Sequence, residues 1–68
     1  MKNVYMKLVI AGARTIASLP KKYIVEVAVG VIEQGIDDGE EYATLEDVPE
    51  AYRNEVEEKL IEDGYMEA

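Results

Sequence analysis

An acidic segment in the middle of the chain, residues 36–43, holds the residues best suited to metal chemistry. Its carboxylates are hard oxygen donors of the kind that Ca²⁺ and Mg²⁺ prefer: Asp37, Asp38, Glu40 and Glu41. The spacing does not fit a calcium-binding loop, because with Gly39 at the sixth position the first and third positions hold Gln34 and Ile36. We therefore predict a solvated acidic loop, with a weak cation site between Asp37 and Glu41 as the alternative.

Other catalytic chemistry lacks its usual residues. The chain has no Cys and no His, which excludes disulfides, thiolate zinc sites, iron–sulfur clusters, cysteine nucleophiles and the commonest general base. Thr15, Ser18 and Thr44 stand at positions where helix capping explains them. The carboxylates are spread over a loop and over helix faces that we expect to be exposed. We predict no enzymatic activity, no metal centre and no cofactor.

Length and composition restrict the fold and the cellular location. The 68 residues suffice for one small domain, residues 1–68, and a hydrophobic content of 49% is typical of a folded protein in spite of the net charge of -8. Lys7 interrupts the apolar start of the chain, which argues against a signal peptide. The apolar run Tyr23–Ile32 carries Glu26 and has about half of the roughly 20 residues that a membrane-spanning helix needs. We expect a cytoplasmic protein without a membrane segment.

An internal repeat organises the sequence. Residues 15–23 align without gaps on residues 44–52, and the similarity continues to the glycines that end each unit, so that the repeat units are 15–35 and 44–64. Each unit starts with a threonine, continues with an apolar residue and a proline, and has a tyrosine three positions after the proline. Tyr23 and Tyr52 therefore predict one shared packing role at the start of a helix.

The repeat and the apolar periodicity predict an all-α fold with three helices. Two long helices are expected over Leu19–Gln34 and Val48–Asp63, each with a proline in its first turn, and a third is expected over Asn3–Ala11. Short capped turns precede the two long helices, with Thr15 and Thr44 as caps of the turns and Ser18 and Asp47 as caps of the helices. Gly35 and Gly64 are expected in the left-handed conformation that ends a helix.

The segment Tyr23–Ile32 is ambiguous when taken alone. Its alternating valines favour a strand, whereas its counterpart in the second unit has a helical period rich in Glu and Lys. The repeat leads us to prefer a helix and to keep a strand as the alternative. As a helix, the segment is apolar on nearly every side, so we expect it at the centre of the fold with more apolar surface than two neighbours can cover. This predicts a homo-oligomer.

Charge is divided unequally along the chain. Residues 1–34 sum to +3 and residues 35–68 to -11. Nucleic-acid binding is not expected, because phosphate contacts need clustered Lys and Arg. Two kinds of protein partner remain: the acidic half can dock on the basic half of a second copy, or it can occupy a basic surface of another protein. The candidate partner-binding residues are Lys21, Lys22, Glu57, Glu58 and Glu62.

The first half of the chain resembles a known group of proteins. Residues 5–16, followed by Leu19 and Pro20 and an apolar helix, are similar to short uncharacterised proteins encoded among the tail genes of prophages in gram-positive bacteria. The resemblance implies a phage-derived origin and a place near the tail or the virion, with no known activity to transfer. We therefore predict a non-enzymatic interaction or assembly protein. The alternative is an acidic inhibitor that imitates DNA and binds a nucleic-acid-binding protein.

Overall fold

A computed structural model describes all 68 residues, and its secondary-structure elements are all helices. Helix α1 spans Lys2–Ile10, α2 spans Lys21–Asp38 and α3 spans Glu50–Glu62, while two short 3₁₀ helices, η1 (Ile16–Ser18) and η2 (Leu45–Asp47), precede α2 and α3. The predicted all-α class with three helices and two short turns is confirmed. The segment Tyr23–Ile32 is helical throughout, so the strand alternative is wrong.

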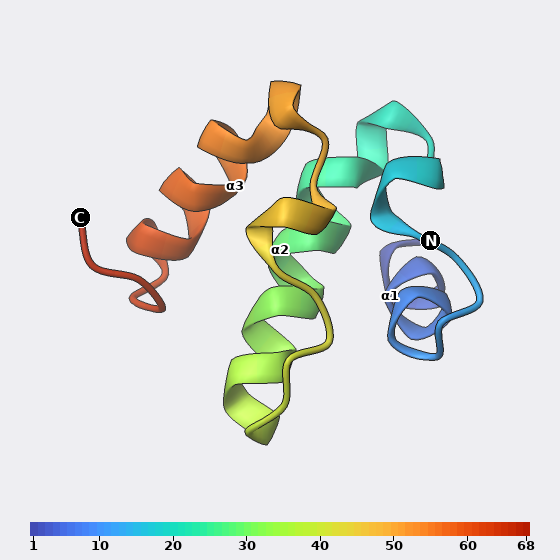
Figure 1. Cartoon of the computed structure of the whole chain (residues 1–68), viewed down its shortest axis with the longest axis horizontal. Helices are drawn as coiled ribbons and strands as arrows, with labels where there is room; N and C mark the ends of the chain where they lie inside the picture. Colours follow the sequence, from blue (N-terminus) through green and yellow to red (C-terminus); the bar gives the residue numbers. More distant parts are fainter.

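Helix α2 is the centre of the molecule. It lies between α1 and α3 and contacts both, and the segment that connects α2 to α3 passes across a further side of it (Figure 1). Val27, Ala28 and Val31 of α2 are fully buried. As expected, two neighbours do not cover the apolar surface of this helix. The connecting segment of the same chain supplies a third neighbour through Ala43 and Val48.

The core is one apolar cluster without a buried polar residue. It draws on both 3₁₀ regions and on all three α-helices. Because each element contributes only a few side chains, no pair of helices forms a core without the turns that connect them. The buried residues are Val9, Ile16, Leu19, Ile24, Val27, Ala28, Val31, Ile32, Ala43, Val48, Val56 and Leu60. No helix is both long enough and apolar enough to cross a membrane.

The sequence repeat is also a repeat of backbone structure. Thr15 and Thr44 are both extended, and Pro20 and Pro49 have nearly the same dihedral angles, with φ of -55° and -53° and ψ of 140° in both. Each proline carbonyl accepts a hydrogen bond of 2.9 Å from the N–H of the tyrosine three residues later. Each proline thus immediately precedes the first turn of its helix, so the helices begin two residues later than expected, at Lys21 and Glu50.

The capping predictions are confirmed only in the second unit. Thr44 and Asp47 form a capping box in which the Thr44 N–H donates to Asp47 Oδ2 at 2.9 Å. In the first unit the Thr15 side chain caps nothing, and the Ser18 hydroxyl donates to the Thr15 carbonyl at 2.7 Å. Ser18 and Asp47 do not cap α2 and α3, because an extended apolar residue and the proline stand between each of them and its helix.

All three α-helices end at a glycine with positive φ, which lacks the side chain that would clash in this conformation. Gly64 takes this role as expected, with φ of 84°, and Gly12 takes it after α1, with φ of 79°. The prediction for Gly35 is wrong: α2 continues through it and ends at Gly39, with φ of 72°. The expected acidic loop is shorter for the same reason, because Asp37 and Asp38 belong to the last turn of α2.

Gly35 instead permits a close approach of the connecting segment. A Cβ atom at this position would lie 2.9 Å from the Glu40 carbonyl oxygen and 3.3 Å from the Tyr42 nitrogen. The Gly35 carbonyl in turn accepts a hydrogen bond of 2.8 Å from the Glu40 N–H. The glycine that aligns with Gly64 in the repeat therefore has a different task, which is to let the chain turn back tightly over α2.

Candidate functional site

The most promising binding surface is an open groove on the side of α2 that the connecting segment leaves uncovered. Its floor is formed by Val25 and Val29 of α2, which are only half-buried. Its rim carries charged residues from all three helices, and its volume is about 370 Å³. The rim residues are Lys2, Lys22, Glu26, Glu55 and Lys59. A groove with an apolar floor and a charged rim can receive an apolar side chain that protrudes from another molecule and has charged residues next to it on that molecule.

The groove is positive in a chain that is otherwise strongly acidic. Three of the seven basic residues of the chain stand on its rim with two glutamates, for a net charge of +1, so the remainder of the chain sums to -9. The two arginines are engaged elsewhere. Arg14 donates to the Ser18 carbonyl and lies 5.4 Å over the Tyr5 ring, and Arg53 donates to the carbonyls of Val48 and Glu46. The basic side chains without a hydrogen bond in the chain are therefore the five lysines. Three of them lie at the groove, and of these Lys22 also lies 5.2 Å over the Tyr23 ring.

Helix α2 has its end charges in the unfavourable order. A helix dipole places partial positive charge at the N-terminus and partial negative charge at the C-terminus. Helix α2 begins with Lys21 and Lys22 and ends with Asp37 and Asp38, with no acid in its first turn and no base in its last. Helix α3 has the favourable order, with Glu50 in the first turn and Lys59 in the last. Opposite charges from another molecule would therefore stabilise both ends of α2.

A second cluster lies between the C-terminal part of α2 and the segment that follows α3. The Tyr65 hydroxyl donates to both carboxylate oxygens of Asp37, at 3.0 and 2.9 Å. Glu33, one turn before Asp37, is half-buried, and its Oε2 atom is buried without a hydrogen-bond partner among the surrounding donors. Burial, a shared hydrogen bond with Asp63 and the nearby charges of Asp63 and Asp37 raise the pKa of Glu33 to about 7, while Lys2 acts in the opposite direction. Glu33 is therefore a carboxyl group that gains or loses its proton near neutrality.

The structure does not gather the carboxylates of the acidic segment into a group of metal ligands. No three potential ligands among the acidic residues lie close enough together to hold a metal ion. Asp37 accepts the bonds from Tyr65, and Asp38 accepts a hydrogen bond of 3.0 Å from Tyr42. These hydrogen bonds to carboxylates are the first cause of the raised pKa of both tyrosines. Asp37 and Asp38, two of the four carboxylates proposed as cation ligands, thus form hydrogen bonds within the fold.

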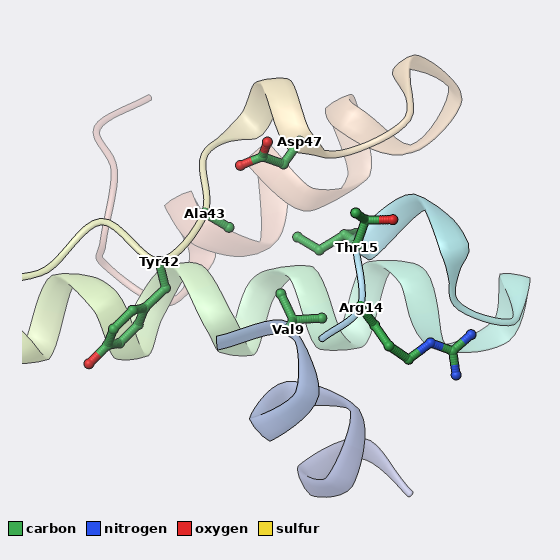
Figure 2. Close-up of a pocket in the computed structure, with 7 residues that line it drawn as sticks. Val9, Arg14, Thr15, Tyr42, Ala43 and Asp47 are labelled. Atoms are coloured by element: carbon green, nitrogen blue, oxygen red, sulfur yellow. The ribbon is translucent and has the colours of Figure 1, made fainter. Parts of the chain in front are cut away.

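A smaller pocket, with a volume of about 190 Å³, lies where the end of α1 meets the connecting segment. Figure 2 shows Arg14 and Tyr42 directed away from each other on its two sides, with Val9 and Ala43 between them. The Arg14 guanidinium is held by the Ser18 carbonyl, so the polar side chains do not converge on a common point. This pocket offers no arrangement for catalysis.

The structure separates the candidate partner-binding residues into distinct patches. All five are exposed, with Lys21 and Lys22 at the start of α2, and Glu57, Glu58 and Glu62 along α3. Only Lys22 lines the groove. Uncovered apolar surface was expected on this helix, but Val25 and Val29 were not singled out, because an apolar period does not tell which side of a helix its neighbours cover. Lys2 and Lys59 were missed because they come together with Lys22 only in the folded chain.

The chain was compared with protein-family models, curated proteins and solved structures, and none of them matches it.

Proposed function

We propose that this protein is a non-enzymatic assembly protein that associates with further copies of itself, and that the groove over Val25 and Val29 receives the partner. The observation that carries the proposal is the apolar floor with Lys2, Lys22 and Lys59 on its rim. A chain of net charge -8 can place acidic surface against this rim without a separate basic partner. The phage-tail setting implied by the resemblance of residues 5–20 is part of the same proposal.

Sedimentation velocity across a range of protein and salt concentrations tests self-association. We expect oligomers that weaken as salt screens the lysines, and we expect the double variant Lys22→Glu/Lys59→Glu to be monomeric. Lys7→Glu is the matched control, because Lys7 is an exposed lysine of α1 outside the groove. A wild-type chain that stays monomeric at the highest soluble concentration would contradict the proposal, as would equal weakening by the control.

A second candidate function, an acidic inhibitor of a nucleic-acid-binding protein, is favoured by the outer surface of α3. Glu57, Glu58 and Glu62 are exposed there, and their side chains form no hydrogen bond within the chain. Such a surface can attract a basic, DNA-binding surface. The test is capture of a partner that duplex DNA displaces and that Glu57→Lys/Glu58→Lys/Glu62→Lys no longer binds. A partner that is bound equally by this variant would count against the inhibitor.

A further inference from the structure

The exposed apolar residues of the chain indicate which surface can enter the groove. Only Met1, Val4 and Ile36 are large apolar residues with more than half of their surface exposed. Ile36 lies in the last turn of α2 and is followed directly by Asp37 and Asp38. Glu40 and Glu41 come two residues later. The C-terminal end of α2 is therefore an apolar side chain next to four carboxylates, which we call the acidic end of α2 (residues 36–41).

The groove has a complementary composition, an apolar floor with three lysines and two glutamates around it, for a net charge of +1. We propose that the acidic end of α2 of one copy occupies the groove of a second copy, with Ile36 against Val25 and Val29. The inference rests on the self-association proposed above and names the surface that enters the groove. Ile36 would then lose its contact with water, and the carboxylates beside it would approach Lys2, Lys22 and Lys59.

The other exposed surfaces fit less well. Met1 adjoins Lys2, which is itself on the rim, and Val4 has Lys7 about one turn later on α1, so a second copy presenting either residue would bring like charges together. The outer surface of α3 has the acidic residues Glu57, Glu58 and Glu62, but none of the three large exposed apolar residues lies on it. The acidic end of α2 is the one surface of the chain that combines an exposed large apolar residue with a concentration of negative charge.

The charge order of α2 supports the same pairing. Lys21 and Lys22 add to the positive end of the helix dipole, and Asp37 and Asp38 add to the negative end. When the acidic end of one α2 meets the rim at Lys22 of another, the negative end of one helix comes to lie near the positive end of the next. Both unfavourable ends thereby gain further opposite charges, which are missing from the first and the last turn of α2 itself.

The proposed contact joins two different surfaces of the chain, because each copy gives one surface and receives another. Val25, Val29 and Ile36 fall on one side of α2, within about 40° of each other at 100° per residue, and Ile36 follows the middle of the groove by about 13 Å along the helix. Both surfaces stay accessible on the same copy. Because both surfaces lie on one side of α2, two copies with antiparallel α2 helices can make both contacts at once as a two-fold dimer, whereas a head-to-tail arrangement continues from copy to copy into a closed ring or an open filament.

Complementation between two variants tests the inference. Lys22→Glu/Lys59→Glu disables the groove and leaves the acidic end intact, and Ile36→Ser does the reverse. All three residues are exposed, so we expect circular dichroism to find wild-type helix content in both. In sedimentation velocity each variant alone should be monomeric, whereas an equimolar mixture should form a 1:1 dimer, because one intact groove and one intact acidic end remain and growth stops there. Val4→Ser is the matched control, since Val4 and Ile36 are both 51% exposed, and it should assemble like the wild type.

The outcomes separate this inference from the self-association on which it rests. A wild-type chain that stays monomeric overturns both. If the wild type assembles and Ile36→Ser assembles equally well, another surface occupies the groove and the inference alone is wrong. If both variants are monomeric and their mixture is also monomeric, the contact is not between groove and acidic end, and the inference is again overturned.

Discussion

The Tyr65 hydroxyl donates to both carboxylate oxygens of Asp37, across 28 positions of the sequence. This one hydrogen, shared between the two oxygens, connects the segment after α3 to the last turn of α2. Tyr65 and Met66 also pack on the core from this segment, and the N–H groups of both donate to the Leu60 carbonyl. The end of the chain is thus held by one polar contact at its outer side and by apolar contacts beneath it.

Tyr65→Phe should lower the free energy of unfolding by about 1 kcal/mol, because it removes a hydrogen bond to a charged acceptor and leaves the ring in place. Urea denaturation followed by circular dichroism measures the change. Tyr42→Phe is the matched control, because its hydroxyl bonds Asp38 only four residues away and connects no distant segments. An equal loss in the two variants would show that Tyr65 does not fasten the chain end.

The raised pKa of Glu33 leads us to predict how the free energy of unfolding depends on pH. The pKa of Glu33 is raised from 4.5 to about 7 in the folded chain, so the folded state binds the proton more tightly than the unfolded state. This contribution is complete below pH 4.5 and is lost as the pH rises through 7. A tenfold difference in proton affinity corresponds to about 1.4 kcal/mol, and partial exposure to solvent reduces the total, so we expect a loss of about 1 to 2 kcal/mol between pH 5 and 8.

Glu33→Gln isolates this contribution from the other carboxylates of an acidic chain. The amide keeps the size of the side chain and a donor toward Asp63, but it does not titrate. We expect the variant to be more stable than the wild type at pH 8 and to have a smaller decrease in stability between pH 5 and 8. Parallel pH dependence of the two proteins would contradict a raised pKa at Glu33, and a ¹³C NMR titration of its carboxyl group would locate the true value.

Two helical glycines of α2 should respond differently to alanine. At Gly35 the new Cβ atom would meet backbone, the Glu40 carbonyl oxygen at 2.9 Å, so the connecting segment must shift. At Gly30 it would meet the end of the flexible Met6 side chain, with the sulfur at 2.7 Å, and Met6 can move. Alanine also favours a helix interior over glycine by about 1 kcal/mol.

We therefore expect Gly35→Ala to lower the free energy of unfolding by about 1 to 3 kcal/mol, a range typical of overpacked sites. Gly30→Ala should be within about 1 kcal/mol of the wild type, since the helical preference and the displaced Met6 act in opposite directions. Thermal and urea denaturation of both variants measure this. If the two substitutions have equal effects, the tight passage of the connecting segment over Gly35 is wrong.

The different surroundings of Gly30 and Gly35 also show which features of the fold could not be predicted from the sequence. The three helices follow from the apolar period and from the prolines that precede α2 and α3, which act within a few neighbouring residues. The role of Gly35 depends on a segment that folds back after Gly39, and no local pattern contains that contact. The exposure of Val25 and Val29 likewise depends on which side of α2 the connecting segment covers.

The charge order of α2 predicts that stability and assembly oppose each other at Lys21. This residue is exposed in the first turn, where a positive charge is unfavourable to the helix dipole. Lys21→Glu should therefore stabilise the monomer by about 0.3 to 1 kcal/mol, as acids at helix N-termini do. The same change places a negative charge beside the surface that receives the acidic end of α2, so self-association should weaken.

Denaturation under conditions that keep the chain monomeric measures the effect of Lys21→Glu on stability, and sedimentation velocity measures its effect on self-association. Lys7→Glu is a fitting control, because Lys7 stands in the last turn of α1, where the acid should destabilise the helix and leave the groove unaffected. If Lys21→Glu were both more stable and equally associated, the end charges of α2 would have no part in assembly.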